Sequence, residues 1–78
     1  MYDFLLGNEW LEEAVDRFAD KGWSEEQIAD YITAWSSRVV AYVLYLMMEG
    51  YSVAETVQIV NAAVDEADFD LAKMPIVP

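Results

Sequence analysis

The stretch Ser24–Glu49, with the sequence SEEQIADYITAWSSRVVAYVLYLMME, decides the fold that we expect for this chain. Ser24 and Gln27 form a capping box, in which each side chain accepts a hydrogen bond from the other residue's backbone N–H at a helix start. Gly50 follows the stretch and suits the left-handed conformation that closes a helix, because it has no Cβ. We therefore predict one helix over 24–49, about 39 Å long at about 1.5 Å per residue.

The side chains of this predicted helix change character halfway along. In its first half, Ile28, Ile32 and Trp35 recur at helical spacing opposite polar positions. In its second half, residues 39–48 are apolar on every side. A helix of this length is too long to be covered by two short neighbours, so part of the apolar half is expected to need a further partner.

Length and composition exclude several kinds of chemistry. The chain has 78 residues, which is one domain with a small core, and it contains no cysteine and no histidine. Thiolate and imidazole are the usual ligands of structural zinc and the usual general bases, so we expect no metal and no cofactor. The longest apolar run is about half of a bilayer span, and no basic region precedes the apolar N-terminal residues. We expect no membrane association and a cytoplasmic protein, in the host cytoplasm if the chain is virus-encoded.

The charge balance is strongly acidic. There are 15 Asp and Glu against 4 Lys and Arg, a formal net charge of −11. Direct binding to nucleic acid or to an anionic membrane needs cationic side chains, so neither is expected. The balance suits a basic protein partner or a stand-in for nucleic acid; the simpler alternative is that the charge only keeps the protein soluble.

Two further helices flank the long one. We predict a helix over 8–21, capped by Asn8 or started earlier by Asp3 with Gly7 inside, and a helix over 52–67 that begins with a Ser52/Glu55 capping box. Residues 71–78 are expected to form an extended tail, because Pro75 and Pro78 oppose a helix.

The two junctions between the helices share one pattern. Each has a glycine, an aromatic residue and a capping serine, in 21–24 and again in 49–52. The aromatic residue is expected to pack on the helix that has just ended, Trp23 on Phe18 and Tyr51 on Leu46. Tight corners of this kind make neighbouring helices antiparallel. We therefore predict an all-α domain over 1–70, with three antiparallel helices around the long central one.

This arrangement predicts an acidic end and an apolar end. The acidic pole is the set of carboxylates expected where the first helix ends, the second begins and the third ends: Asp16, Asp20, Glu25, Glu26, Asp30, Asp65, Glu66, Asp68 and Asp70. Asp65, Glu66 and Asp68 lie at or just past the end of the third helix, where the helix dipole disfavours negative charge. The sequence shows no compensating group, and an unfavourable placement of this kind is expected where residues serve a function such as binding a partner. The apolar half is expected to mediate oligomerisation through Val39, Tyr42, Val43, Leu44, Tyr45, Leu46, Met47 and Met48.

Three occupants of the apolar half stay open. A second copy would give a homodimer or a higher oligomer packed into a larger helical bundle, which is the occupant we expect. The N-terminal segment Tyr2–Leu6 could instead fold over it, or a different protein could bind there. The flexible side chains of Met47 and Met48 would suit a different protein as well.

An enzyme is not expected. Ser36, Ser37 and Arg38 have no histidine or nearby lysine to activate a serine, and Asp65, Asp68 and Asp70 lack the spacing and the glycine of a calcium-binding EF-hand loop. The leading hypothesis is a small inhibitor, of the kind that phages and mobile elements encode, whose acidic pole blocks a basic, nucleic-acid-binding surface on a target. The alternative is a structural, assembly or adaptor module that binds through the apolar half.

Overall fold

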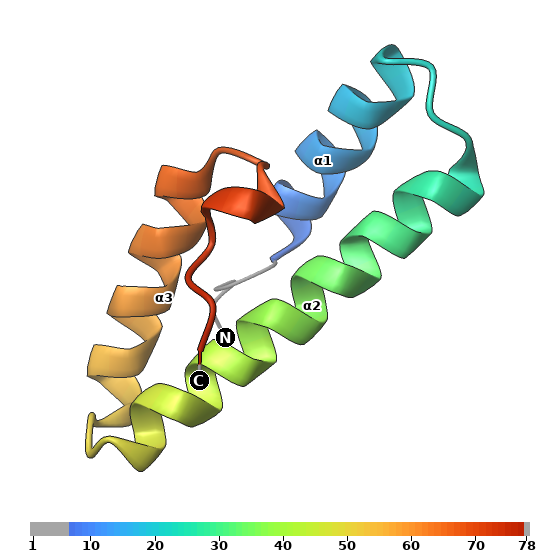
Figure 1. Cartoon of the computed structure of the whole chain (residues 1–78). Helices are drawn as coiled ribbons and strands as arrows, with labels where there is room; N and C mark the ends of the chain where they lie inside the picture. Colours follow the sequence, from blue (N-terminus) through green and yellow to red (C-terminus); the bar gives the residue numbers. More distant parts are fainter. Residues whose placement is uncertain (1–6, 78) are drawn as a thin grey trace.

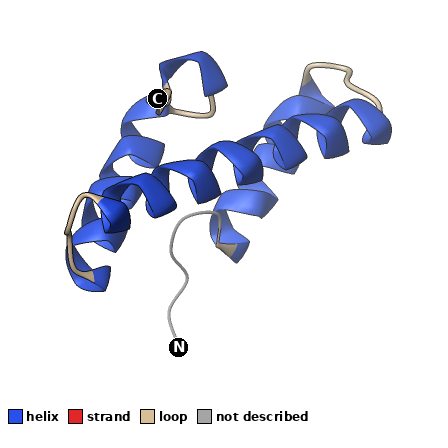
Figure 2. Ribbon diagram, turned by 60° about the horizontal axis from the view of Figure 1, so that its bottom comes forward, coloured by secondary structure: helices blue, strands red, loops and turns tan. Residues whose placement is uncertain are grey.

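The structure, a computed structural model, describes residues 7–77 and is built of helices joined by short turns (Figures 1 and 2). The three helices expected from the sequence are α1 (Asn8–Asp20), α2 (Glu25–Met48) and α3 (Val53–Ala67). A single turn of 3-10 helix, η1 (Leu71–Lys73), follows α3. Among the described residues there is no strand, so the fold is all-α.

Both predicted capping boxes are present. The Ser24 hydroxyl accepts a hydrogen bond from the Gln27 backbone N–H at 3.2 Å, and the Gln27 side-chain oxygen accepts one from the Ser24 N–H at 2.8 Å. Ser52 and Glu55 repeat the arrangement at 3.1 and 3.0 Å. Local sequence therefore determines where α2 and α3 begin.

The start of α1 differs from our expectation. Gly7, with φ −72° and ψ 177°, occupies the N-cap position, and no side chain caps the helix there. Asn8 is the first helical residue, so its prediction as the cap is wrong by one position. The extended backbone of Gly7 also contradicts the alternative in which Gly7 lies inside the helix; Asp3 lies outside the described residues.

Both corners have the same backbone geometry. Gly22 (φ +88°) and Gly50 (φ +102°) adopt left-handed conformations in which a Cβ would be strained. The N–H of each glycine and of the following aromatic residue donate to carbonyls in the last turn of the preceding helix, at 2.9–3.2 Å. The Trp23 ring stacks on Phe18 with centroids 4.5 Å apart, as predicted, whereas Tyr51 remains 44% exposed.

The flanking helices lie along α2 one after the other. Figure 1 shows α1 beside the first half of α2 and α3 beside the second half, with the end of α3 close to the start of α1. The sequence predicts the end of α3 at the corner between α1 and α2. The helix α3 is shorter than α2 and itself ends before that corner, but the turn that follows α3 lies close to it, because Arg17 in the last turn of α1 contacts Asp68.

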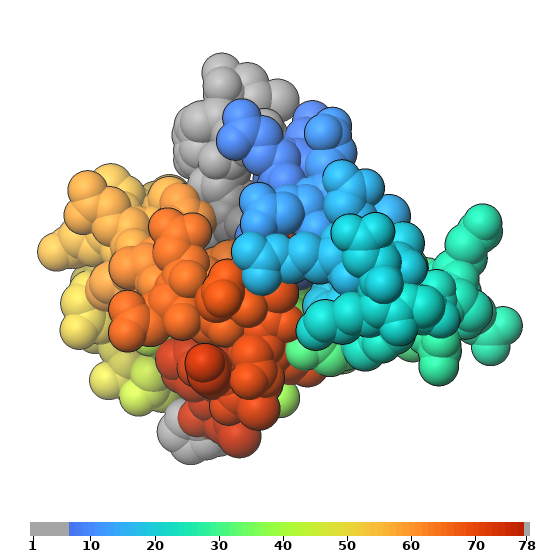
Figure 3. All heavy atoms as spheres, turned by 90° about the horizontal axis from the view of Figure 1, so that it is seen from above, coloured from blue at the N-terminus to red at the C-terminus, as the bar shows by residue number. Residues whose placement is uncertain are grey.

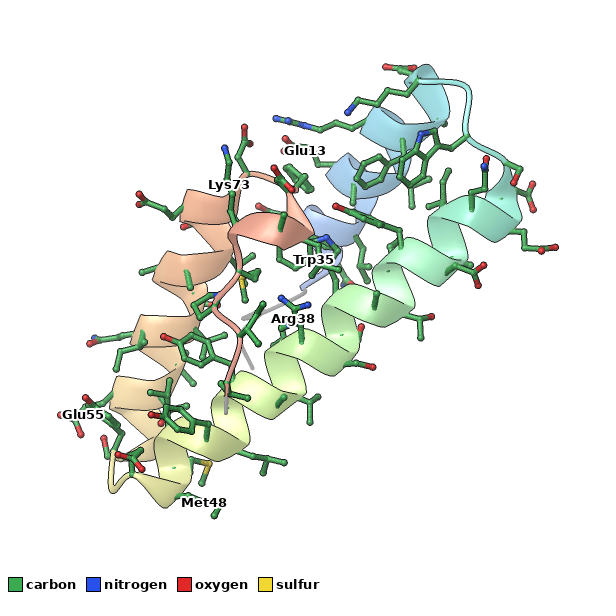
Figure 4. All side chains as sticks on the ribbon, in the orientation of Figure 1. Glu13, Trp35, Arg38, Met48, Glu55 and Lys73 are labelled. Carbon is green, nitrogen blue, oxygen red and sulfur yellow. The ribbon has the colours of Figure 1, made fainter. Side chains whose placement is uncertain are left out.

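The core has an aromatic part and an aliphatic part. Beside α1, Ala14, Phe18 and Ile28 are buried, with Trp10, Trp23 and Tyr31 packed around them. Beside α3, the buried residues are Trp35, Val39, Leu46, Val60, Val64, Ala67 and Met74. Trp35 lies in the middle of the molecule (Figure 4) and makes an edge contact with Trp10, 5.2 Å between ring centroids. This contact joins the two parts.

A strained turn brings the chain back to α2 after α3. Asp68 (φ 48°) and Phe69 (φ 65°) both have left-handed backbone conformations, which non-glycine residues seldom adopt. The Tyr31 hydroxyl donates to the Phe69 carbonyl at 3.3 Å and accepts from the Leu71 N–H at 3.0 Å. The Phe69 ring stacks on Trp10 at 5.2 Å. These contacts offset the strain and hold the turn against α1 and α2.

The segment after this turn is not the extended tail that we expected. It forms η1, and the Met74 side chain is only 2% exposed in the core beside α3. Arg38 donates to the Met74 carbonyl at 3.4 Å. Figure 3 shows the end of the chain packed beside α3. The folded unit therefore extends beyond residue 70.

Candidate functional site

Every Asp and Glu side chain in residues 7–77 is exposed. The nine carboxylates of the acidic pole are therefore all accessible, but they do not form one cluster. Those of α1 and of the first two turns of α2 form one group, around the α1–α2 corner. Asp65 and Glu66 on the last turn of α3, with Asp68 and Asp70 in the turn that follows, form the second group.

The group on α1 is larger than the sequence reasoning had assigned. Carboxylates at i, i+3 and i+4 spacing lie on one face of a helix, roughly 6 Å apart. The outer face of α1 has five of them, which we call the acidic ridge: Glu9, Glu12, Glu13, Asp16 and Asp20. Glu9, Glu12 and Glu13 were left out of the pole because they precede the end of the helix. The helical spacing alone could have identified them.

The group at the turn after α3 lies beside cationic side chains. Arg17 contacts the Asp68 carboxylate at 3.5 Å and the Glu13 carboxylate at 2.9 Å. Its guanidinium carbon lies 4.5 Å from the centroid of the Phe69 ring. The Asp70 carboxylate accepts from the Ala72 N–H at 3.1 Å and so caps η1. Asp68 and Asp70 thus have the local partners that the sequence did not reveal.

An open cleft of about 580 Å³ lies between this turn and the α1–α2 corner. Three members of the acidic pole line it: Asp20, Asp68 and Asp70. Arg17 and Lys21 line it too, and the Lys21 ammonium lies 5.6 Å from the centroid of the Phe18 ring. The cleft therefore has mixed charge, and its own cations weaken its attraction for a basic partner.

Most of the carboxylates on α1 and at the start of α2 have no ion pair with these cations. Among the described residues, Glu13 is the one member of the acidic ridge with an ion pair, and Glu25, Glu26 and Asp30 have none. The ridge and these three residues are all exposed, on α1 and on the first two turns of α2, and we call them together the acidic surface. This surface is the candidate site for a basic partner.

The apolar half of α2 is divided between the core and the surface. Val39 and Leu46 are buried, and Tyr42, Val43 and Tyr45 pack against them. The rest of the predicted oligomerisation residues stay exposed: Leu44 at 56%, Met47 at 45% and Met48 at 86%. Val40, which the sequence reasoning did not include, is 57% exposed. We call Val40, Leu44, Met47 and Met48 the apolar stripe.

The stripe lies on the side of α2 opposite the two other helices. Figure 4 shows side chains on this side directed away from α1 and α3, with Met48 at the lower end of α2. The covering segment Tyr2–Leu6 that we considered lies outside the described residues. The second predicted surface is thus reduced to three of its eight residues, to which the structure adds Val40.

One carboxylate has a shifted pKa. The Ser52 backbone N–H, and then its hydroxyl, hold the pKa of Glu55 below its ordinary value by hydrogen bonding to the ionised form. The cause is the capping box of α3, so the shift reflects helix capping rather than catalysis.

The described part of the chain shows no group that could hold a metal ion, Asp65, Asp68 and Asp70 included. Ser36 and Ser37 are exposed on α2. Within residues 7–77, no helix is both long and apolar enough to cross a bilayer. Comparison with known proteins finds no matching family model, no matching curated protein and no matching solved structure.

Proposed function

We propose that this chain is a small acidic, non-enzymatic inhibitor that blocks a basic, nucleic-acid-binding surface on a target protein. The observation that carries the proposal is the acidic surface of α1 and the start of α2, whose carboxylates are all exposed. It consists of Glu9, Glu12, Glu13, Asp16, Asp20, Glu25, Glu26 and Asp30. Such inhibitors are known from phages and mobile elements, which would place this one in a host cytoplasm.

The spacing of these carboxylates supports mimicry of nucleic acid. Neighbouring carboxylates on one helix face stand roughly 6 Å apart, comparable to adjacent phosphates along a strand. α1 is a rigid carrier for them, since Ala14 and Phe18 fix its inner face in the core. A target site that recognises a row of phosphates would therefore meet a row of negative charges already held in place.

The distribution of cations supports the same role. Arg17 and Lys21 lie over aromatic rings on the inner side, and Arg38 is bonded to the backbone of the C-terminal segment. Their charges are directed away from most of the acidic ridge. The negative potential of the ridge is therefore left available for long-range attraction of a basic target.

The test is a charge reversal on the ridge, Glu12→Lys with Asp16→Lys and Asp20→Lys, with the Gln and Asn replacements as a neutral control. The immobilised wild-type chain is used to capture partners from a nuclease-treated lysate. We expect a basic partner that is lost on the reversed chain, weakened on the neutral one and released by salt, because exposed charges are screened at high ionic strength. Equal capture by the wild-type and reversed chains would contradict the proposal.

A second candidate function rests on the apolar stripe. The exposure of Leu44 and Met48 favours a structural, assembly or adaptor module that binds through α2 while the acids maintain solubility. Replacing both residues with Gln separates the candidates. The inhibitor role predicts that this variant keeps its basic partner, whereas the adaptor role predicts that it loses its partner and that the ridge reversal does not.

A further inference from the structure

A second open cleft, of about 350 Å³, lies at the start of α2. The α1–α2 corner is at one end of the molecule, away from α3 (Figures 1 and 2), so this part of α2 is accessible. The cleft follows one side of the helix from the corner onward, because its residues recur at helical spacing. They are Trp23, Gln27, Asp30, Tyr31 and Ala34.

Two aromatic rings form adjoining walls of this cleft. The centroids of the Trp23 and Tyr31 rings lie 5.3 Å apart, and the ring planes are inclined at 87°. Trp23 is held by its stacking on Phe18. The Tyr31 hydroxyl is bonded to the Phe69 carbonyl and to the Leu71 N–H. Both walls are thus fixed before a ligand arrives, so binding does not have to order them.

The cleft has the groups that attract a cation. A cation binds the face of an aromatic ring, most strongly that of Trp, and pairs with a carboxylate. Arg17 and Lys21 lie over phenylalanine rings in the neighbouring cleft of mixed charge, and no Lys or Arg of residues 7–77 lines this one. The Asp30 carboxylate is exposed and has no ion pair with a described residue. Aromatic surface and a negative charge therefore stand together without a cation of their own.

We propose that this cleft binds an arginine side chain of a partner protein, with the guanidinium against the Trp23 and Tyr31 rings and paired with the Asp30 carboxylate. A guanidinium fits better than an ammonium, because it is planar and weakly hydrated, and it can stack on a ring while its N–H groups donate to a carboxylate. The origin of the arginine rests on the proposed function, since arginine is a side chain with which nucleic-acid-binding surfaces hold phosphates.

Titration with two short peptides, followed by nuclear magnetic resonance, tests the site without the partner. The probes are acetyl-Gly-Arg-Gly-amide and its lysine counterpart, which carry the same single charge. We expect the arginine peptide to shift the indole N–H signal of Trp23 and to leave that of the buried Trp35 in place. The lysine peptide should bind more weakly. Equal affinity for the two peptides, or no shift at Trp23, would overturn the proposal.

Three variants separate the cleft from the general attraction of an acidic chain. Trp23→Leu should weaken binding of the arginine peptide about two- to fivefold, the effect of an exposed cation–π contact. Asp30→Asn should weaken it by a similar factor, as loss of an exposed ion pair does. Because Asp30 is exposed, this variant leaves the core unchanged. Glu49→Gln removes one charge at the other end of α2 and is the matched control, which should bind like the wild type. Equal weakening by Asp30→Asn and Glu49→Gln would overturn the proposal.

The arginine site and the proposed function can fail separately. The ridge reversal changes Glu12, Asp16 and Asp20, none of which lines this cleft. If the arginine peptide binds at Trp23 but the wild-type chain captures no basic partner, the site stands and the proposed function falls. If a partner is captured and lost on the ridge reversal while the peptide does not bind, the proposed function stands and the arginine site is overturned.

Discussion

The two halves of α2 lie in different surroundings although they belong to one continuous helix. The first half has exposed carboxylates on its outer side, and its inner side packs on α1 through Ile28 and through an edge contact between Tyr31 and Phe18. The second half packs on the aliphatic side of α3 and leaves an uncharged stripe outside. Charge and exposed apolar surface are thus separated along one helix, so each can be changed without disturbing the other.

The largest loss of stability is expected from replacing Trp35, where the two halves of α2 meet. Trp35 is 0% exposed and touches both parts of the core. Trp35→Ala should cost about 3–5 kcal/mol of unfolding free energy, which is most of the stability of a domain this small. Denaturant unfolding measures the loss. Trp35→Phe should cost much less, since it keeps a ring and removes an indole N–H without a partner among the described residues. Equal losses would mean that the Trp10 contact does not join the halves.

The next effect tests whether the C-terminal segment belongs to the second half. Met74→Ala should cost about 2–5 kcal/mol, because it empties a buried position between α2 and α3. Ile76, two residues further on and 80% exposed, provides the control: Ile76→Ala should stay within about 0.5 kcal/mol of the wild type. Similar values for both variants would show that the segment does not contribute to the core.

A smaller and equal effect is expected at the two corners. Ser24→Ala removes the cap of α2 and Ser52→Ala removes the cap of α3. Each should cost about 1 kcal/mol, because one backbone N–H loses its acceptor in either case. Thermal unfolding of the two variants at pH 7 measures this. A markedly larger loss at one corner would show that the two halves of α2 do not depend equally on local capping.

The smallest effect distinguishes the corners by pH. Glu55 has a lowered pKa in the folded chain, so its ionised form stabilises the fold. This stabilisation is fully present above the ordinary pKa of 4.5 and is lost as the pH falls through the folded-state pKa. The destabilisation by Glu55→Ala should therefore shrink on acidification. Gln27 holds the same position at the other corner and does not titrate. Gln27→Ala should keep a constant cost from pH 7 to pH 3, and a parallel decline in both variants would contradict the assignment.

The helices and corners could be predicted because their causes are local. Ser24 with Gln27, Ser52 with Glu55, and the glycines at 22 and 50 each act within a few residues of the structure they determine. The start of α1 was misplaced by one residue, since Gly7 caps it without a side-chain signal. The acidic ridge could also be predicted from the sequence, because i, i+4 spacing lies within a single helix.

What the sequence by itself determined is thus the three α-helices, their order and the separation of charge from apolar surface along α2. Only the tertiary structure decided where α3 ends relative to α1, how the strained turn at Asp68 and Phe69 is held, and that Met74 is buried. It also decided which apolar residues of α2 stay outside. The physical reason is distance along the chain. Tyr31 meets Phe69 across 38 residues, and no periodicity or cap encodes such a contact until the helices have packed.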